Sequence, residues 1–312
     1  MQVKKRFNYT TDEGSKIRVT LADLTADDAK TLLESNTDNR KLRRAKVDEY
    51  RRAIERGDFL FNGDAIRISD EHVMLDGQHR LEALAQTDKT ITMLIVEGLP
   101  SEARETIDVG ATRTAANLLE FGEDRQTNAV NIAALGRAAL IMQDQPMPSK
   151  LEVVQFVHQH REELERAYRQ GAHVIESSPL KGGTTPYALA AWLIGQREED
   201  PEVIEFFFRK LASGEGLFHG DPILSLRNRL VGTPPSTEGG SRHRYMKNSW
   251  LFLRAWNAWA TGQELTVIRG WSEGQALPEV KPAITRVRKA VHAANEAGQE
   301  ATIEFSDEQV PA

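Results

Sequence analysis

The chain turns from a strand pattern to a helix pattern within Leu75-Asp76-Gly77-Gln78-His79-Arg80-Leu81-Glu82-Ala83-Leu84. Before this stretch, apolar and polar residues alternate over residues 65–69, and a turn at 70–71 leads to a second short strand over 72–75. After Gly77, apolar residues recur at intervals of three and four, which is the spacing of one helix face. Asp76-Gly77 is therefore a predicted strand-to-helix turn, in which Gly77 can adopt a backbone conformation closed to other residues.

The polar residues of this turn suit a phosphate group. The start of a helix offers backbone N–H groups and the positive end of its dipole to an anion. Arg80, expected to be exposed there, is a fork-shaped phosphate donor, and His79 can donate to a phosphate or move a proton near neutral pH. Asp76 can hold a metal, a sugar hydroxyl or an attacking hydroxyl. The alternative is that Asp76 only caps the helix and the others are solvated, but the combination favours a phosphate or nucleotide site.

The run G-Q-H-R followed by an alanine-bearing helix resembles the signature of the ParB/sulfiredoxin superfamily. It is most similar to the DGQHR-type "ParB-like nuclease" proteins common in phages. The matching turn reads Gly-Cys-His-Arg in sulfiredoxins and Asp-Gly-His-His-Arg in the free-serine kinases, and in ParB proteins it is a Gly-x-Arg-Arg box that binds CTP. Gln78 stands where sulfiredoxins carry their reactive cysteine, which excludes their reaction, and His79 departs from the first arginine of the ParB box.

The turn supplies most of the candidate site. Phosphate or nucleotide binding is expected from Gly77, Gln78, His79 and Arg80. Catalysis is expected from Asp76, His79 and Glu82, with Asp76 also as a metal ligand.

Two further polar segments are expected to reach the same phosphate chain. Asn39 and Arg40 precede a predicted helix over residues 41–56, and the phage proteins carry a similar Asn-Arg pair there. A second polar turn contains Asp108, Arg113 and Thr114, opens a predicted helix over 115–121, and is also part of the resemblance. An ordinary helix-capping function of a threonine in this turn is an equally good interpretation.

The predicted helix over residues 41–56 belongs to the most basic part of the chain. Residues 40–56 hold eight Lys/Arg against three acidic residues. A nucleic-acid backbone is one natural partner of such a helix, and a solvated surface is the alternative. The candidate contacts to nucleic acid are Lys41, Arg43, Arg44 and Arg51.

Bulk composition narrows the class of protein. The net charge of −6 argues against a chain that coats nucleic acid everywhere, although it allows a local basic face. The absence of cysteine excludes disulfides, thiolate chemistry and Cys-based zinc sites. We expect a cytoplasmic protein, or one in the host cytoplasm if phage-encoded, because no apolar run reaches the roughly 20 residues of a membrane span and the N-terminus lacks a signal peptide.

A chain of 312 residues can bury one or two cores, and two are expected. Residues 1–122 are expected to form an α/β (α+β) domain, ParB/sulfiredoxin-like by resemblance, with further strands over 16–20 and 91–96 and a helix over 100–108. Residues 123–278 are expected to form an all-helical domain, including one helix over 149–168 and one over 242–261 whose tryptophans lie in the core. Residues 279–312 are expected to be a polar helix and tail.

Three functions remain open at this point. The first is an enzyme that binds a nucleoside triphosphate or diphosphate, with Mg²⁺ as a candidate metal, and transfers or hydrolyses phosphate in a DNA-related process. The second is a metal-dependent DNA nuclease in which Asp76, Glu82 and Asp108 supply the carboxylates. The third is a non-enzymatic DNA-binding or regulatory module. The nucleotide, the phosphate acceptor and the oligomeric state are left open.

Overall fold

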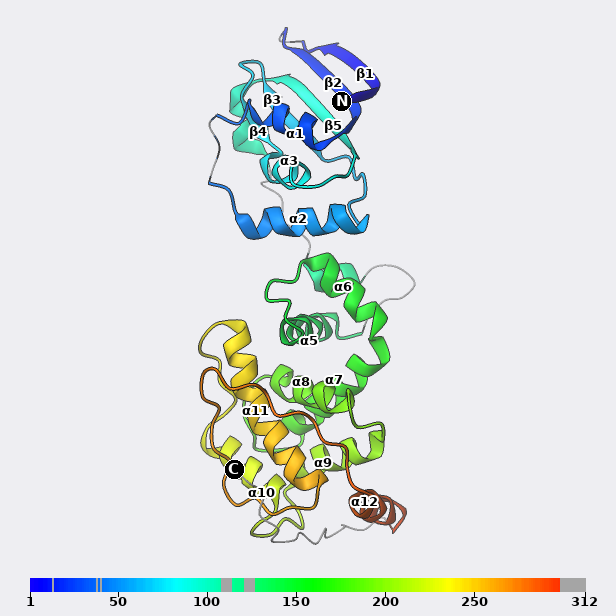
Figure 1. The fold of residues 1–312 in the computed structure, drawn as a ribbon, viewed down its shortest axis with the longest axis vertical. Coiled ribbons are helices and arrows are strands. Elements are labelled where there is room, and N and C mark those ends of the chain that lie inside the picture. The colour runs from blue at the N-terminus through cyan, green and yellow to red at the C-terminus, as the bar shows by residue number, and fades with distance from the viewer. Residues whose placement is uncertain (13, 38, 40, 108–113, 121–126, 298–312) are drawn as a thin grey trace. The chain divides into compact units, whose positions relative to one another are not determined.

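The computed structural model describes all residues except 13, 38, 40, 108–113, 121–126 and 298–312. It divides the chain into two compact units, Met1–Thr112 and Arg113–Ala312 (Figure 1). The first unit holds a mixed five-stranded sheet with helices, and the described part of the second is helical. The expected order of an α/β region followed by a helical region is therefore confirmed.

The sheet of the first unit has the strand order β1-β2-β5-β3-β4. Strands β3 and β5 pair in parallel, and the other neighbouring strands of the described sheet are antiparallel. The strands are β1 Gln2–Thr10, β2 Lys16–Leu24, β3 Ala65–Ser69, β4 Met74–Asp76 and β5 Ile91–Leu99.

Strand β1 was not predicted, and β2 and β5 are longer than expected. All nine residues of β1 are exposed, and in its sequence only Phe7 and Tyr9 alternate with polar residues after a run of three cations, which is a shorter apolar alternation than that of a core strand. Strand β4 begins at Met74 rather than at residue 72, because His72 has a positive φ of 61° and belongs to the turn.

Helices cover one face of this sheet. They are α1 Ala26–Leu33, α2 Arg44–Arg56 and α3 Gln78–Leu84. The start of α1 is the expected capping box, in which Thr25 and Asp28 bond reciprocally. The core between sheet and helices is formed by Leu24, Ile66, Met74, Leu81, Leu84, Met93 and Ile95. The predicted helix over 100–108 is a short 3₁₀ helix, η1 Ser101–Thr106.

The second unit consists of helices packed around an aromatic core. They are α4 Ala115–Leu119, α5 Ala129–Met142, α6 Lys150–Gln159, α7 Arg161–Glu176, α8 Thr184–Gly195, α9 Pro201–Ser213, α10 Pro222–Gly232, α11 Ser241–Ala260 and α12 Thr285–Ala297. Trp256 and Trp259 of α11 are buried against Phe207 of α9. This confirms that the tryptophans of the long helix include core residues.

One expected helix is broken. The predicted helix over 149–168 is interrupted at His160, whose φ of −117° and ψ of 27° are not helical. His160 ends α6 and begins α7, and its ring lies 4.5 Å from that of Phe156. Both helices keep the same apolar spacing on either side of His160, so the sequence pattern carries no sign of the break.

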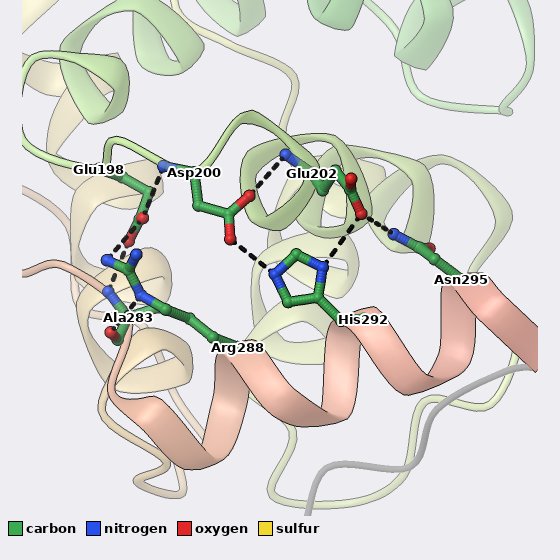
Figure 2. A network of polar contacts seen from close by, with 7 residues as sticks. All are labelled: Glu198, Asp200, Glu202, Ala283, Arg288, His292 and Asn295. Atoms are coloured by element: carbon green, nitrogen blue, oxygen red, sulfur yellow. Dashed lines mark hydrogen bonds and ion pairs between the residues drawn. The ribbon is translucent and has the colours of Figure 1, made fainter.

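A buried carboxylate holds α12 to the rest of its unit (Figure 2). Glu198 Oε2 accepts the backbone N–H of Ala283 at 2.6 Å, and Oε1 accepts the N–H of Asp200 at 3.0 Å. The guanidinium Nη2 of Arg288, on α12, lies 2.8 Å from Oε1. The segment before α12 and the helix itself are thus tied to one side chain between α8 and α9.

His292 makes a second connection between α12 and the start of α9 (Figure 2). Its Nε2 lies 2.8 Å from Asp200 Oδ2, and its Nδ1 lies 3.1 Å from Glu202 Oε2. The hydrogen bond to Asp200, assisted by the charges of both carboxylates, raises the pKa of His292 above its usual value.

None of the helices in the described ranges is both long enough and apolar enough to cross a membrane.

Candidate functional site

The strand-to-helix turn is built around Gly77. Strand β4 ends at Asp76, and Gly77 follows with a φ of 111°, a conformation that residues with a side chain rarely adopt. A Cβ at this position would also clash with the side chain of Ile66 on β3. Glycine therefore allows β4 to pass directly into α3 against its neighbouring strand, which confirms the predicted turn.

The carboxylate of Asp76 lies between two arginines. Its Oδ2 accepts hydrogen bonds from Arg67 Nη1 at 2.7 Å and from Arg80 Nη2 at 2.9 Å. Its Oδ1 accepts the N–H of Gly77 at 2.7 Å. Arg67 is paired with Asp76 in the register of β3 and β4, so the sheet itself sets up this contact.

Arg80 is buried, and the expectation that it would be exposed is wrong. Only 8% of it is accessible, and its Nη2 also donates to the carbonyl of Ala65 at 2.8 Å. The guanidinium satisfies a backbone acceptor and a carboxylate from inside the fold. Arg80 thus orients Asp76, and its contact with an entering ligand would be indirect.

His79 is also largely buried, with 9% of its surface accessible. Its Nε2 accepts the backbone N–H of Arg43 at 3.1 Å. An acceptor at Nε2 places the proton of a neutral ring on Nδ1, so any proton donation by His79 would come from Nδ1.

Helix α2 begins later than predicted, because Arg43 is extended where its N–H donates to His79. Arg43 is extended, with φ −93° and ψ 99°, and α2 begins at Arg44 rather than at the expected residue 41. Lys41, Arg43 and Arg44 are exposed. Arg51 lies 2.8 Å from Glu55 and 3.9 Å from Asp48, so its charge is already balanced on its own helix. Of the four predicted nucleic-acid contacts, the first three are therefore the better candidates.

A pocket of about 190 Å³ opens beside the turn. It is lined by Asn39, Leu75, Asp76, Gln78, His79, Arg104 and Ile107. The fold thus brings Asn39 to the residues of the D-G-Q-H-R stretch, from a segment about 40 positions earlier in the chain. The position of Asn39 agrees with the expected convergence, and its neighbour Arg40 lies outside the described residues.

Amide side chains fix the Asn39 side of the pocket. Asn39 Nδ2 donates to Asn36 Oδ1 at 2.6 Å and to the carbonyl of Met74 at 2.7 Å. Asn36 Nδ2 in turn lies 3.5 Å from Gln78 Oε1. The loop before α2 is therefore joined to both β4 and the first residue of α3.

Arg104 is a pocket residue that sequence reasoning missed. It lies on η1, and its Nη2 is 3.4 Å from the carbonyl of Met74. Arg67, the second partner of Asp76, was missed as well. Arg67 is the polar residue between two isoleucines of a strand and Arg104 lies in a polar segment, and only the pairing of distant segments brings them to the turn.

Several predicted site residues are not placed in this pocket. Glu82 lies on α3 but is not among the residues that line it. Arg40, Asp108 and Arg113 lie outside the described residues. Thr114 accepts the N–H of Asn117 at 3.1 Å and begins α4 with a capping box, so it has the ordinary capping function.

The described residues contain no group of three or more histidine and carboxylate side chains that could hold a metal. Asp76 was expected to be a metal ligand, and it has no such group around it. Any metal bound by Asp76 would take further ligands from water and from the phosphates of a bound nucleotide, as Mg²⁺ commonly does.

Comparisons of the chain with protein-family models, with curated proteins and with solved structures found no match.

Proposed function

We propose that the first unit binds the phosphate groups of a nucleoside triphosphate or diphosphate in the pocket beside Asp76. The observation that carries this proposal is the convergence of Asn39, Asp76, Gln78, His79 and Arg104 on one pocket. Its volume of about 190 Å³ is below the roughly 300–1,000 Å³ of sites that enclose a drug-sized ligand. A phosphate chain fits such a space, and the base and sugar would extend beyond it.

Charge supports an anionic ligand. Arg67 and Arg80 surround the single carboxylate of Asp76, and Arg104 lies on the pocket wall. Asp76 Oδ2 is bonded by both Arg67 and Arg80, so its negative charge is offset at the edge of the pocket. Arginine is suited to phosphate because its planar fork matches two phosphate oxygens.

The proposed chemistry is transfer or hydrolysis of a phosphoryl group in a DNA-related process. Reactions of this class depend mainly on positioning and charge stabilisation. Arg104 would contact the phosphate directly, Gln78 would orient it, and His79 Nδ1 would donate a proton or hydrogen bond. Asn39, whose Nδ2 donates to Asn36 and to the carbonyl of Met74, would hold the wall of the pocket in place. A bound Mg²⁺ would screen the phosphate charge from Asp76, whose Oδ1 retains a lone pair beyond its bond to Gly77.

The proposal includes a ParB/sulfiredoxin-like fold for this unit. Supporting it are the D-G-Q-H-R turn between β4 and α3 and the mixed sheet around it. The second candidate function is a DNA-binding regulatory module, favoured by the exposed basic residues Lys41, Arg43 and Arg44. A metal-dependent nuclease stays an alternative: of its three expected carboxylates, Asp76 and Glu82 lie at the turn and on α3, and Asp108 lies outside the described residues.

The test is incubation of the full chain with labelled ATP, CTP and ADP, with and without DNA and Mg²⁺. Release or transfer of labelled phosphate supports the enzymatic proposal, and shortening of the DNA would favour the nuclease. Binding of DNA with a strong salt dependence, without turnover of any nucleotide, would replace the proposal with the regulatory module.

A further inference from the structure

Strand β1 is an edge strand. Among the described strands it is hydrogen-bonded to β2 alone, and it lies at the end of the sheet (Figure 1). After Val3 its sequence reads Lys4-Lys5-Arg6-Phe7-Asn8-Tyr9. Three cations are thus followed directly by two aromatic residues in alternate positions.

The two aromatic side chains lie in the open. Phe7 is 54% exposed and Tyr9 is 61% exposed. Residues two apart on a strand point to the same face, so Lys5, Phe7 and Tyr9 share one face of β1. Lys5 Nζ lies 5.0 Å from the centre of the Phe7 ring. This face therefore presents two rings and a cation together.

On the neighbouring strands β2 and β5, the same face of the sheet carries aliphatic side chains. Phe7 is paired with Val19 and Tyr9 with Ile17 on β2, and Val19 is paired with Val96 on β5. These three aliphatic residues are half-buried. The alternate positions of β2 and β5, which include Ala22 and Ile95, point into the core under the helices. The aromatic face is therefore the one turned away from that core.

The cations of β1 are only partly neutralised. Lys4 lies 2.7 Å from Asp23. Arg6 donates to the hydroxyl of Thr20 at 3.3 Å. Within the described part of the chain, neither Lys5 nor Arg6 has a carboxylate within ion-pair distance. Arg6 alternates with the two rings and lies on the opposite face, whereas Lys5 shares their face, so a positive charge beside the rings favours a polyanion.

We propose that this face of β1 and β2 binds single-stranded nucleic acid. One base stacks on Phe7 and the next on Tyr9, and Lys5 contacts the phosphate backbone. Residues two apart on a strand are separated by about 7 Å, twice the roughly 3.4 Å between stacked bases of a duplex. The rings therefore suit bases that have been separated from each other, which a single strand supplies.

A second copy of the chain is the competing occupant, and charge disfavours it. Symmetric antiparallel pairing over the whole of two β1 strands would place Arg6, the middle residue, directly opposite Arg6 of the other copy, with Lys5 of each copy at the adjacent position. Like charges in facing positions destabilise strand pairs, and lysines on an edge strand oppose such association.

The experiment measures binding of a fluorescein-labelled oligodeoxythymidine of about ten nucleotides to the full chain by fluorescence anisotropy. The double variant Phe7→Ala/Tyr9→Ala should bind at least about ten-fold more weakly than wild type, because each lost ring removes a stacking surface. The control is Phe61→Ala, which removes a ring of similar exposure, 51%, from outside the sheet. It should leave affinity unchanged. Phe7→Trp/Tyr9→Trp keeps the stacking surfaces and should retain binding.

Three results would overturn the proposal. They are absence of binding by wild type at about 50 mM salt, equal affinity of wild type and Phe7→Ala/Tyr9→Ala, and a wild-type dimer that the double variant abolishes. Circular dichroism checks that the variants are folded, as expected for changes at exposed positions. Arg104→Ala should not alter oligonucleotide affinity, which separates this surface from the phosphate pocket.

Discussion

Oδ2 of Asp76 lies 2.9 Å from Nη2 of Arg80, and the pair links the last residue of β4 to the first turn of α3. The same nitrogen of Arg80 donates to the carbonyl of Ala65 on the neighbouring strand. One buried guanidinium therefore fixes the direction of α3 and the orientation of the pocket carboxylate together. Loss of Arg80 should disturb the fold of the turn as well as the site.

Arg80→Ala should lower the free energy of unfolding of the first unit by about 1–3 kcal/mol, since a carbonyl and a carboxylate lose their donor inside the fold. Arg80→Lys should recover only part of this, because one ammonium lacks the fork of the guanidinium. Hydrogen exchange of peptides from residues 1–112 reports on this unit. The matched control is Arg18→Ala, an exposed arginine of β2, which should have little effect. Equal protection in wild type and Arg80→Ala would contradict the structural function of this residue.

Asp76→Asn separates binding from chemistry. The variant keeps the shape of the side chain but leaves Arg67 and Arg80 without a negative partner, so it should bind nucleotide at least as tightly as wild type in the absence of metal. If Asp76 activates a metal or hydroxyl, turnover should fall by about 100-fold or more. Titration and a phosphate-release assay measure the two effects. If Asp76→Asn turns over nucleotide as fast as wild type, Asp76 is not the catalytic carboxylate, and Glu82 and Asp108 are the next residues to test.

Glu198→Ala should destabilise the helical unit by about 3 kcal/mol, because it leaves Arg288 and two backbone N–H groups without their buried acceptor. All five tryptophans belong to this unit, so their fluorescence during urea unfolding reports on it. Glu199→Ala, at the exposed neighbouring position, is the control and should change stability little. If the two variants unfold at the same urea concentration, the buried network contributes nothing measurable.

Asp221 should make the stability of the helical unit depend on pH. Burial raises the pKa of Asp221 to about 6, above its ordinary value of 3.8. The folded state therefore holds the proton more tightly than the unfolded state. The stabilising contribution of Asp221 is therefore complete below about pH 4 and is lost as the pH rises through about 6.

The free energy of unfolding should accordingly fall by up to about 3 kcal/mol across this range. Asp221→Asn does not titrate and still accepts the N–H of Ile223 at the start of α10. Urea unfolding at about pH 4.5 and about pH 7.5 should show a smaller pH dependence for this variant than for wild type. An identical dependence in both proteins would exclude Asp221 as its source.

The local pattern around Gly77 was sufficient to predict the strand-to-helix turn, because a change of period and a glycine both act within a few residues. The capping box at Thr25 and the core position of Trp256 are local in the same sense. Strand β1 escaped prediction because none of its residues is buried, and the break at His160 escaped because the apolar spacing continues through it.

The site was predicted less completely than the fold. Asn39, Asp76, Gln78 and His79 were expected at one place and line one pocket. The burial of Arg80 depends on the carbonyl of Ala65, and the position of Arg104 depends on how η1 packs beside β4. The burial of Arg80 and the position of Arg104 both result from contacts between segments far apart in the sequence, and local residue patterns do not reveal such contacts.

The central claim is that a phosphate chain binds beside Asp76, and calorimetric titration of wild type and Arg104→Ala with ATP, CTP and ADP tests it most directly. Wild type should bind at least one of these nucleotides, and Arg104→Ala should bind it about ten-fold or more weakly, because a charge-assisted hydrogen bond is lost. Arg56→Ala, a cation of the same unit outside the pocket lining, should bind like wild type. Absence of binding by wild type, or equal affinities of wild type and a folded Arg104→Ala, would contradict the claim.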